Sequence, residues 1–451
     1  MVSSRIILGL GNTLVLLPTL TRHALSVTIS RMRLRGLACA LVLIGIASAA
    51  QKKSPPTPPS VTVPATIDHN RVVIDADIPL PDGSMLRTHA WVDNGNPDLY
   101  LSRHLATPLA LTVSCDDKEC SAPPPREIII GGMAIPLAVK EAHIPLKPVS
   151  AASLLAPGMN AEINIPATVL RHYDLLVDFP GRKFTIGAPG SIHFLGSSTK
   201  VLINAENGLI QVPSQIENKK YNLALDLGSS ISFLSGELFD QLATAHSDWP
   251  HMTGAVGPAN MWGMEDELKW KLMRLARVQY GPLFLTDVAV VALPKATMDF
   301  FEKRAGMPTI GLLSSNVFLN YRVGLDYAHS TVYFDIGRLF TNPDFDVVGL
   351  ILRPEDDGSF TILGIADFEG KPSVPTGTDG VQSGDHLVAV DDIPVRGSTM
   401  GLVWSMLGGT PGQERKLTIE RGEKEFVVVA KVQHFLGATD SEEKKGKLGK
   451  R

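Results

Sequence analysis

Two aspartates with matching surroundings are the residues of this sequence best suited to acid–base chemistry. Asp226 ends an apolar run, and Gly228 follows two positions later in Asp-Leu-Gly-Ser-Ser. Asp93 and Gly95 have the same spacing in Asp-Asn-Gly, and both stretches continue into an apolar run that ends in Leu-Ser. A single Asp-x-Gly sequence is a common turn between strands, but a second copy in an equivalent place indicates a functional pair.

Paired aspartates have a definite chemistry. Two carboxylates held face to face cannot both ionise easily, so one pKa rises and the pair shares a proton. Such a pair can activate a water molecule for attack on an amide carbonyl, which requires neither a metal ion nor an organic cofactor. The candidate catalytic residues are Asp93 and Asp226. The residues expected to support their loops are the other members of the two motifs: Asn94, Gly95, Gly228, Ser229 and Ser230.

A second match indicates that a larger unit is repeated. Residues 170–179 parallel residues 318–327, and a short β-like segment follows each of them, at 183–187 and 331–335. Two repeats of similar length predict a pseudo-two-fold molecule with one aspartate in each half. The predicted boundaries are residues 70–190 for the first lobe and residues 200–337 for the second.

The composition favours a β-rich fold. The 451 residues include 40 Gly and 32 Pro, and 44% are hydrophobic, which is typical of turn-rich β structure with a sizeable core. Turn sequences predict hairpins at residues 81–83, 131–132 and 280–282, and residues 237–245 have helical spacing after Ser235, a candidate N-cap. The net charge of −4 gives no support for nucleic-acid binding.

The first 50 residues have the features of a leader. From Met32, two arginines precede an apolar run of about a dozen residues, and small residues follow at 47–50, as in a secretory signal peptide. This run is shorter than the roughly 20 residues that a membrane span needs. We therefore expect a true start at Met32 and export to the periplasm or secretion. An upstream apolar stretch at 6–20 leaves open a retained anchor, which would bring membrane contact.

The remaining cysteines and the terminal segments complete the outline. Proline-rich residues 51–69 predict an extended linker, and the charged residues 438–451 predict a disordered tail. Beyond the leader there are two cysteines, Cys115 and Cys120. An oxidising compartment would permit a disulfide between them. A metal site is the competing interpretation, but two thiols without a neighbouring histidine are a weak set of ligands.

The two aspartate loops and their paired downstream strands resemble those of the pepsin/retropepsin-like aspartic proteases, in particular the exported, two-lobed bacterial members. The resemblance covers roughly residues 70–337. It implies an all-β bilobal fold, peptide-bond hydrolysis in a cleft between the lobes, and Asp93 and Asp226 as the catalytic pair. It also implies hairpins that cover the substrate, and residues 248–271 and the loop between the two cysteines occupy the corresponding regions.

Two features depart from the family pattern. The residue between Asp and Gly is usually Thr or Ser, whose hydroxyl helps to lock the loops together, but here it is Asn94 in one repeat and Leu227 in the other. Asparagine can form a side-chain hydrogen bond, whereas leucine cannot. The later hydrophobic–hydrophobic–Gly element is also altered, to Asn-Ile-Pro at 164–166 and Leu-Leu-Ser at 312–314.

Residues 346–433 resemble a PDZ domain. Gly384 and Asp385, followed by apolar residues 387–390, match the most recognisable strand entry of that family. Such domains bind a peptide C-terminus by adding it as a strand to a sheet edge. One segment stands at the position of that family's carboxylate-binding loop, and a buried strand is an equally open interpretation of it. That segment consists of Gly349, Leu350, Ile351 and Leu352.

The sequence therefore predicts a mainly β protein with two pseudo-symmetric lobes of the aspartic-protease type and a small PDZ-like α+β domain. We expect an exported aspartic-type endopeptidase that needs no cofactor, acts on a peptide or protein substrate and recruits a protein C-terminus through the PDZ-like module. The alternative is a catalytically inactive peptide-binding scaffold that keeps the bilobal cleft. Asn94 and Leu227 favour this alternative.

Overall fold

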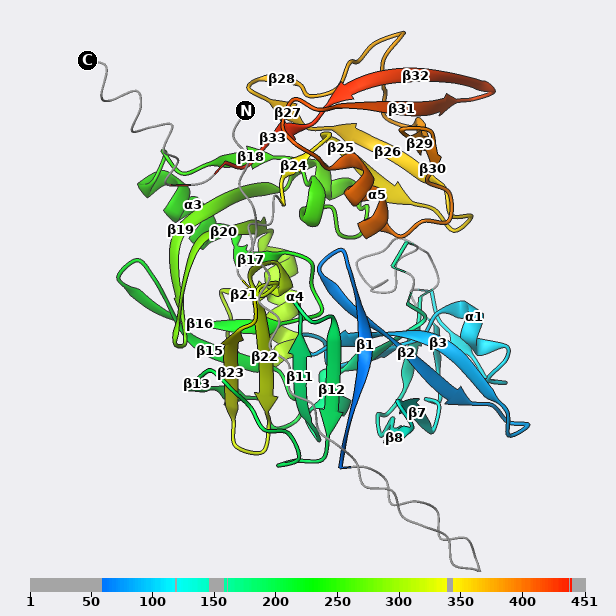
Figure 1. The fold of residues 1–451 in the computed structure, drawn as a ribbon, viewed down its shortest axis with the longest axis vertical. Helices are drawn as coiled ribbons and strands as arrows, with labels where there is room; N and C mark the ends of the chain where they lie inside the picture. Colours follow the sequence, from blue (N-terminus) through cyan, green and yellow to red (C-terminus); the bar gives the residue numbers. More distant parts are fainter. Residues whose placement is uncertain are drawn as a thin grey trace, which may run out of the picture. The chain divides into compact units, whose positions relative to one another are not determined.

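The computed structural model describes residues 59–117, 120–145, 158–159, 161–338, 344–437 and 439. The predicted leader with its start at Met32 lies outside the described residues, as do residues 51–58 of the linker and all but Thr439 of the tail. The described part of the chain is mainly β, as the composition predicted (Figure 1). None of its helices is long and apolar enough to cross a membrane.

One sheet contains strands from both repeats. Among the described residues its order is β10-β3-β2-β1-β12-β11-β22-β23-β13, with β7 and β8 attached through β2. Its strands from the first repeat are β1 (Ser60–Asp68), β2 (Arg71–Pro79), β3 (Met85–Asp93), β7 (Glu127–Ile130), β8 (Met133–Pro136), β10 (Ile163–Pro166), β11 (Asp174–Asp178) and β12 (Lys183–Gly187). Its other strands are β13 (Ser197–Lys200), β22 (Tyr321–Asp326) and β23 (Thr331–Ile336).

The two repeats meet where β11 and β22 pair in antiparallel fashion. Leu176 lies opposite Gly324 in this pair, and the two residues are equivalent in the repeat of 170–179 and 318–327. An antiparallel pair that aligns equivalent positions has a local two-fold axis between them. The internal repeat of the sequence is therefore present as a pseudo-two-fold relation in this strand pair.

Each repeat also has a sheet of its own. In the second repeat the order is β14-β15-β16-β21-β17-β20-β19-β18, and in the first repeat a smaller sheet has the order β4-β9-β6-β5, counting described residues only. The larger sheet consists of β14 (Leu202–Ile203), β15 (Ile210–Ile216), β16 (Lys219–Asp226), β17 (Ser232–Ser235), β18 (His251–Thr253), β19 (Lys271–Tyr280), β20 (Leu283–Leu293) and β21 (Gly311–Ser314). The smaller consists of β4 (Leu99–Tyr100), β5 (Ser114–Cys115), β6 (Cys120–Ala122) and β9 (Ala142–Ile144).

The strand register around the two aspartates repeats residue for residue. Asp93 lies opposite Pro166 in the parallel pair β3–β10, and Asp226 lies opposite Ser314 in the parallel pair β16–β21. Both aspartate loops therefore start from equivalent backbone positions. Two further pairs correspond in the same way: Leu99–Ala142 with Ser232–Val290, and Leu101–Ile163 with Leu234–Gly311.

Local turn and cap signals account for several elements. Gly131 and Gly132 join β7 to β8 with φ values of +55° and +87°, which a two-residue hairpin turn requires. The helix α3 (Gly236–Ala245) begins after Ser235, whose side chain accepts a hydrogen bond from the Leu238 N–H and so confirms the predicted N-cap. The other helical elements of the two repeats are α1 (Arg103–Ala106), α2 (Ala167–Leu170), α4 (Lys295–Ala305), η1 (Gly257–Ala259), η2 (Glu265–Lys269) and η3 (Ser315–Val317).

Residues 60–68 form β1, so the linker predicted over residues 51–69 is wrong for this part. Residues 60–64 pair with β12, and residues 65–68 pair with β2. Each half of the segment thus finds a partner strand. Pairing with strands from elsewhere in the chain outweighs the proline content on which the linker prediction depended.

The C-terminal domain, residues 344–437, has a separate sheet. Its order is β25-β26-β29-β31-β32 with β30 beside β29, so that β25 is an edge strand. The elements of the domain are β24 (Asp346–Val347), β25 (Leu350–Pro354), β26 (Phe360–Ile365), β27 (Asp367–Phe368), β28 (Lys371–Pro372), β29 (His386–Val390), β30 (Ile393–Pro394), α5 (Met400–Leu407), β31 (Glu414–Arg421), β32 (Lys424–Lys431) and β33 (Gln433–His434).

Two large apolar clusters form most of the core of the described residues, beside a small third cluster around Trp91. The larger of the two contains side chains of both repeats. The other is shared by the second repeat and the C-terminal domain, and it joins Ala255 and Met261 to Leu350 and Trp404. Because such buried apolar contacts are the main stabilising contribution to a fold, the C-terminal domain is packed onto the second repeat.

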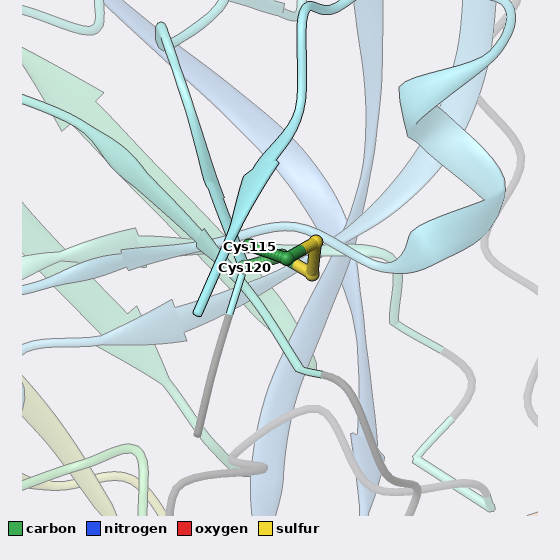
Figure 2. Close-up of a disulfide and its surroundings, with 2 residues drawn as sticks. All are labelled: Cys115 and Cys120. Carbon is green, nitrogen blue, oxygen red and sulfur yellow. A yellow bond between two sulfur atoms is a disulfide. The ribbon is translucent and has the colours of Figure 1, made fainter. Parts of the chain in front are cut away.

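Cys115 and Cys120 form a disulfide between β5 and β6 (Figure 2). The two residues are directly opposite in the antiparallel pair, with their Cα atoms 4.0 Å apart. The bond is the pairing favoured from the sequence, and it leaves neither thiol available for a metal ion.

Candidate active site

The two aspartates face each other at the ends of β3 and β16. Asp93 is 2% exposed, and Asp226 is half-buried. A Cβ atom on Gly95 would lie 2.1 Å from Asp226 Cγ, and one on Gly228 would lie 2.5 Å from Asp93 Oδ1. Because both distances are far inside van der Waals contact, no residue larger than glycine fits at either position. The glycine of each motif thus allows the opposite carboxylate to approach.

Asn94 joins the two loops. Its Nδ2 donates a hydrogen bond to the Leu225 carbonyl (2.9 Å), and its Oδ1 accepts one from the Leu227 N–H (2.8 Å). Both partners are backbone groups, so the second loop needs no hydroxyl of its own at position 227. The Leu227 side chain is buried in the apolar core instead, and its carbonyl accepts a hydrogen bond from Ser315 Oγ (2.8 Å). One asparagine therefore makes two bonds between the loops.

The hydrogen bonds to the two carboxylates differ. Asn164, on β10, donates from Nδ2 to Asp93 Oδ2 (3.1 Å). The equivalent position on β21 is Leu312, which cannot donate. Asp226 Oδ1 instead accepts a hydrogen bond from the Gly228 N–H in its own loop (2.8 Å). The altered element at 164–166 thus supplies a side-chain donor to one aspartate alone.

These surroundings give the two acids different affinities for a proton. Burial, followed by repulsion from Asp226, raises the pKa of Asp93 to about 8, although the hydrogen bond from Asn164 acts to lower it. Burial raises the pKa of Asp226 to about 6. Hydrogen bonds from the Gly228 and Ser229 N–H groups and the attraction of Arg71 act to lower it. Between these two values the pair holds one proton and one negative charge, which the two carboxyl groups share.

A buried arginine lies beside the pair. Arg71 is 2% exposed, its guanidinium lies over the Trp91 ring at 5.9 Å, and its Nη2 donates to the Met261 carbonyl (3.3 Å). Burial lowers the pKa of Arg71 to about 10, so the guanidinium is charged at neutral pH. Its charge partly offsets the negative charge on the aspartates, which favours the singly protonated pair.

Arg304 ties the second repeat to the loop that follows Asp93. It lies at the end of α4, forms an ion pair with Asp98 and donates a hydrogen bond to Asn96 Oδ1 (2.7 Å). Its side chain is 18% exposed. These two contacts restrain the loop from α4 of the second repeat.

The two aspartates and the two arginines line one cavity of about 90 Å³. This volume holds a few water molecules, but binding sites for small molecules begin at roughly 300 Å³. Residues 254–263, which we call the strap, contribute Met261 and Trp262 to its wall. Further apolar walls come from Phe233, Leu293, Met298, Phe301, Met307 and Leu312.

Other predicted site residues lie around this centre. Ser230 Oγ donates to the Pro258 carbonyl (2.7 Å) and Ser229 Oγ to the Ile231 carbonyl (3.1 Å), so both hydroxyls bond to backbone atoms. Residues 248–271, the region of the expected covering hairpin, contain β18, η1 and η2. The segment Gly349–Leu352 is buried and does not line the cavity.

Three residues of the cavity and strap were not singled out from the sequence: Arg71, Arg304 and Asn260. Arg71 begins β2, where a charged residue usually marks the exposed end of a strand. Arg304 is one of two basic residues in the last turn of α4, a position that basic side chains favour for helix-dipole reasons alone. No local pattern distinguishes such residues from surface residues.

No family model and no curated protein matches the chain. Among solved structures, the chain is similar to the crystal structure of an aspartic proteinase from Irpex lacteus, with 10% sequence identity and a TM-score of 0.38, over 63% of this chain and 100% of that chain.

Proposed function

We propose that the protein is an aspartic-type endopeptidase that hydrolyses peptide bonds with Asp93, Asp226 and one water molecule. The observation that carries this proposal is the reciprocal contact of the two loops, in which each glycine makes room for the opposite carboxylate. Two acids held this closely share one proton and can act as acid and base in the same step.

The protonation state sets the roles. Ionised Asp226 takes a proton from the water, and the water oxygen bonds to the carbonyl carbon of the substrate. Asp93 gives its proton to the carbonyl oxygen, which yields a neutral tetrahedral intermediate. As the C–N bond breaks, the leaving nitrogen takes the proton from Asp226, and the intermediate returns a hydroxyl proton to Asp93. The starting state of the pair is then restored.

We further propose that this endopeptidase acts in the periplasm or as a secreted protein. The Cys115–Cys120 disulfide supports this placement because disulfides persist in oxidising compartments. The C-terminal domain would act as a PDZ-like module that recruits a peptide or protein, with a protein C-terminus as the expected ligand. The sheet order, with β25 at its edge, supports recognition by strand addition.

A catalytically inactive peptide-binding scaffold is the second candidate. The small cavity, about 90 Å³, favours it, because a peptide requires more room than a few water molecules do.

The test uses the full chain and a diverse peptide mixture, from about pH 4 to about pH 9, with cleavage read by mass spectrometry. We expect cuts by the native protein that are absent with Asp93→Asn and with Asp226→Asn. Asp367→Asn, which changes an exposed aspartate of the C-terminal domain, is the matched control and should retain the cuts. Absence of cuts at every pH, from a folded protein that still binds peptides, would establish the scaffold instead.

A further inference from the structure

The strap lies in the groove between β25 and α5 of the C-terminal domain. Within the strap, η1 lies against α5. On the other side, Asn260 Nδ2 donates to the Leu352 carbonyl (3.0 Å), and Asn260 Oδ1 accepts from the Leu352 N–H (2.9 Å). Leu352 lies on the edge strand β25, and an antiparallel strand added beside β25 would make the same two bonds to it. The fully buried Asn260 therefore takes the place of an added strand.

The fit is close at both ends of the strap. A Cβ atom on Gly263 would lie 2.6 Å from Arg353 Cα, and one on Gly254 would lie 3.2 Å from Ile351 Cδ1. Between these glycines the strap is mainly apolar, and Ala255, Val256 and Ala259 belong to the same core cluster as Val403 and Trp404 of α5. The groove is thus filled along its length by the protein's own chain.

The opposite side of the strap is bound to the catalytic region. The carbonyl groups of Gly257, Pro258 and Met261 accept hydrogen bonds from three side chains of the two repeats: His69 Nε2 (3.1 Å), Ser230 Oγ (2.7 Å) and Arg71 Nη2 (3.3 Å). Met261 and Trp262 also form part of the cavity wall. One segment therefore occupies the groove of the C-terminal domain and narrows the cavity above the aspartates.

We propose that the strap is a built-in inhibitor, and that an extended apolar peptide which pairs with the edge of β25 displaces it and opens the catalytic cavity. This inference rests on the proposed function for its activity readout. It explains why a cavity of about 90 Å³ lies above a complete pair of aspartates. The substrate enters only after the strap has left the groove.

The strap indicates the chemistry of the displacing ligand. It is apolar and binds through one side-chain amide that mimics a peptide group. The Val348 N–H donates to the Leu407 carbonyl, and the Leu350 N–H donates to the Val348 carbonyl. These two N–H groups are thus already engaged, so an internal apolar segment replaces the protein C-terminus of the proposed function as the expected ligand. Because the strap is tethered, its effective concentration is of the order of millimolar, and a ligand of equal affinity for the groove must reach about this concentration to compete.

The first experiment weakens the seat of the strap with Asn260→Ala. The variant loses the two hydrogen bonds to Leu352 and a third from Asn260 Nδ2 to Glu267 Oε2 (2.5 Å). This loss should increase the affinity for a peptide with a non-hydrolysable hydroxyethylene group about tenfold, and hydrogen exchange in residues 254–263 should become faster. Gln382→Ala is the matched control, because it removes a side-chain amide that donates to the Gly377 carbonyl (2.9 Å) within the same domain. Unchanged or lower affinity in Asn260→Ala would overturn the proposal.

The second experiment locks the strap and remains informative if Asn260→Ala does not fold. A Cβ atom on Gly254 would lie 3.6 Å from Ala366 Cβ, within the range of a disulfide. In the oxidised Gly254→Cys/Ala366→Cys protein, binding of the hydroxyethylene peptide should be lost, and reduction should restore it. The native protein with and without reductant controls for the Cys115–Cys120 bond. Equal binding by the locked and released forms would contradict the proposal.

The third experiment supplies the ligand as a synthetic peptide with the sequence of residues 254–263, at about 1 mM, the order of the effective concentration of the tethered strap. It should accelerate hydrolysis and strap exchange, whereas the same peptide with Ala in place of Asn260 should not. Faster strap exchange and tighter peptide binding without hydrolysis would refute the endopeptidase and support the strap. Hydrolysis that depends on both aspartates but ignores Asn260→Ala and the added peptide would refute the strap alone.

Discussion

Replacing Asn94 with alanine should separate the two aspartate loops. The Asn94 side chain is 1% exposed, and it bonds to the Leu225 carbonyl and the Leu227 N–H. Alanine would leave both of these buried backbone groups without their partner, at about 1–3 kcal/mol each. We therefore expect Asn94→Ala to lower the free energy of unfolding by about 2–5 kcal/mol. Asn94→Thr keeps an acceptor for the Leu227 N–H and should recover about half of this loss.

The measurement is urea denaturation followed by tryptophan fluorescence. The matched control is Asn222→Ala, which changes an exposed asparagine on the same strand as Asp226 and should alter the free energy of unfolding by less than about 0.5 kcal/mol. The rate of peptide hydrolysis should also fall by about 100-fold in Asn94→Ala, since a displacement near 1 Å is enough for such a loss. If Asn94→Ala and Asn222→Ala unfold at the same urea concentration, the proposed lock between the loops is wrong.

Three further predictions concern the carboxylates, a glycine and the disulfide. Because the folded-state pKa of Asp226 is raised to about 6 from an ordinary value of 3.8, the native protein should lose stability as the pH rises from 4 through 6. Asp226→Asn should reduce this loss by about 3 kcal/mol, as measured by urea denaturation at both ends of the range. The raised pKa of Asp93 accounts for the loss that remains. Gly228→Ala places a methyl group 2.5 Å from Asp93 Oδ1 and should abolish hydrolysis; retention of native kcat/KM would show that the loops are not in this contact. Removal of the Cys115–Cys120 bond by substitution of both residues with serine should cost about 2 kcal/mol in the free energy of unfolding, and an unchanged value would argue against the bond.

The aspartate loops could be located from the sequence because their signal is local and occurs twice. Asp93 and Asp226 each have a glycine two positions later, and the repeat of 170–179 in 318–327 gives the same alignment as the strand register. The helix after Ser235 was also predictable, since its cap and its apolar spacing lie within a few residues. Each of these features depends on near neighbours in the chain.

The features that the sequence did not reveal depend on distant contacts. Asn94 bonds to a carbonyl 131 positions away. The motif around Asn94 shows that the residue departs from a family pattern, but it does not show that Asn94 joins the two loops. The β1 strand forms because β2 and β12 flank it, although the prolines within and just before it predict a linker. Asn260 pairs with Leu352, 92 positions away, and no pattern near either residue indicates that the strap fills a groove of another domain.

The pH dependence of kcat/KM for one cleaved peptide tests the central claim most directly. If Asp93 and Asp226 share one proton as acid and base, the profile should be bell-shaped, with limbs near the pKa values of about 6 and about 8. Asp93→Asn and Asp226→Asn should each abolish the activity. Hydrolysis that persists in either variant, or a profile without the limb near pH 6, would contradict the account.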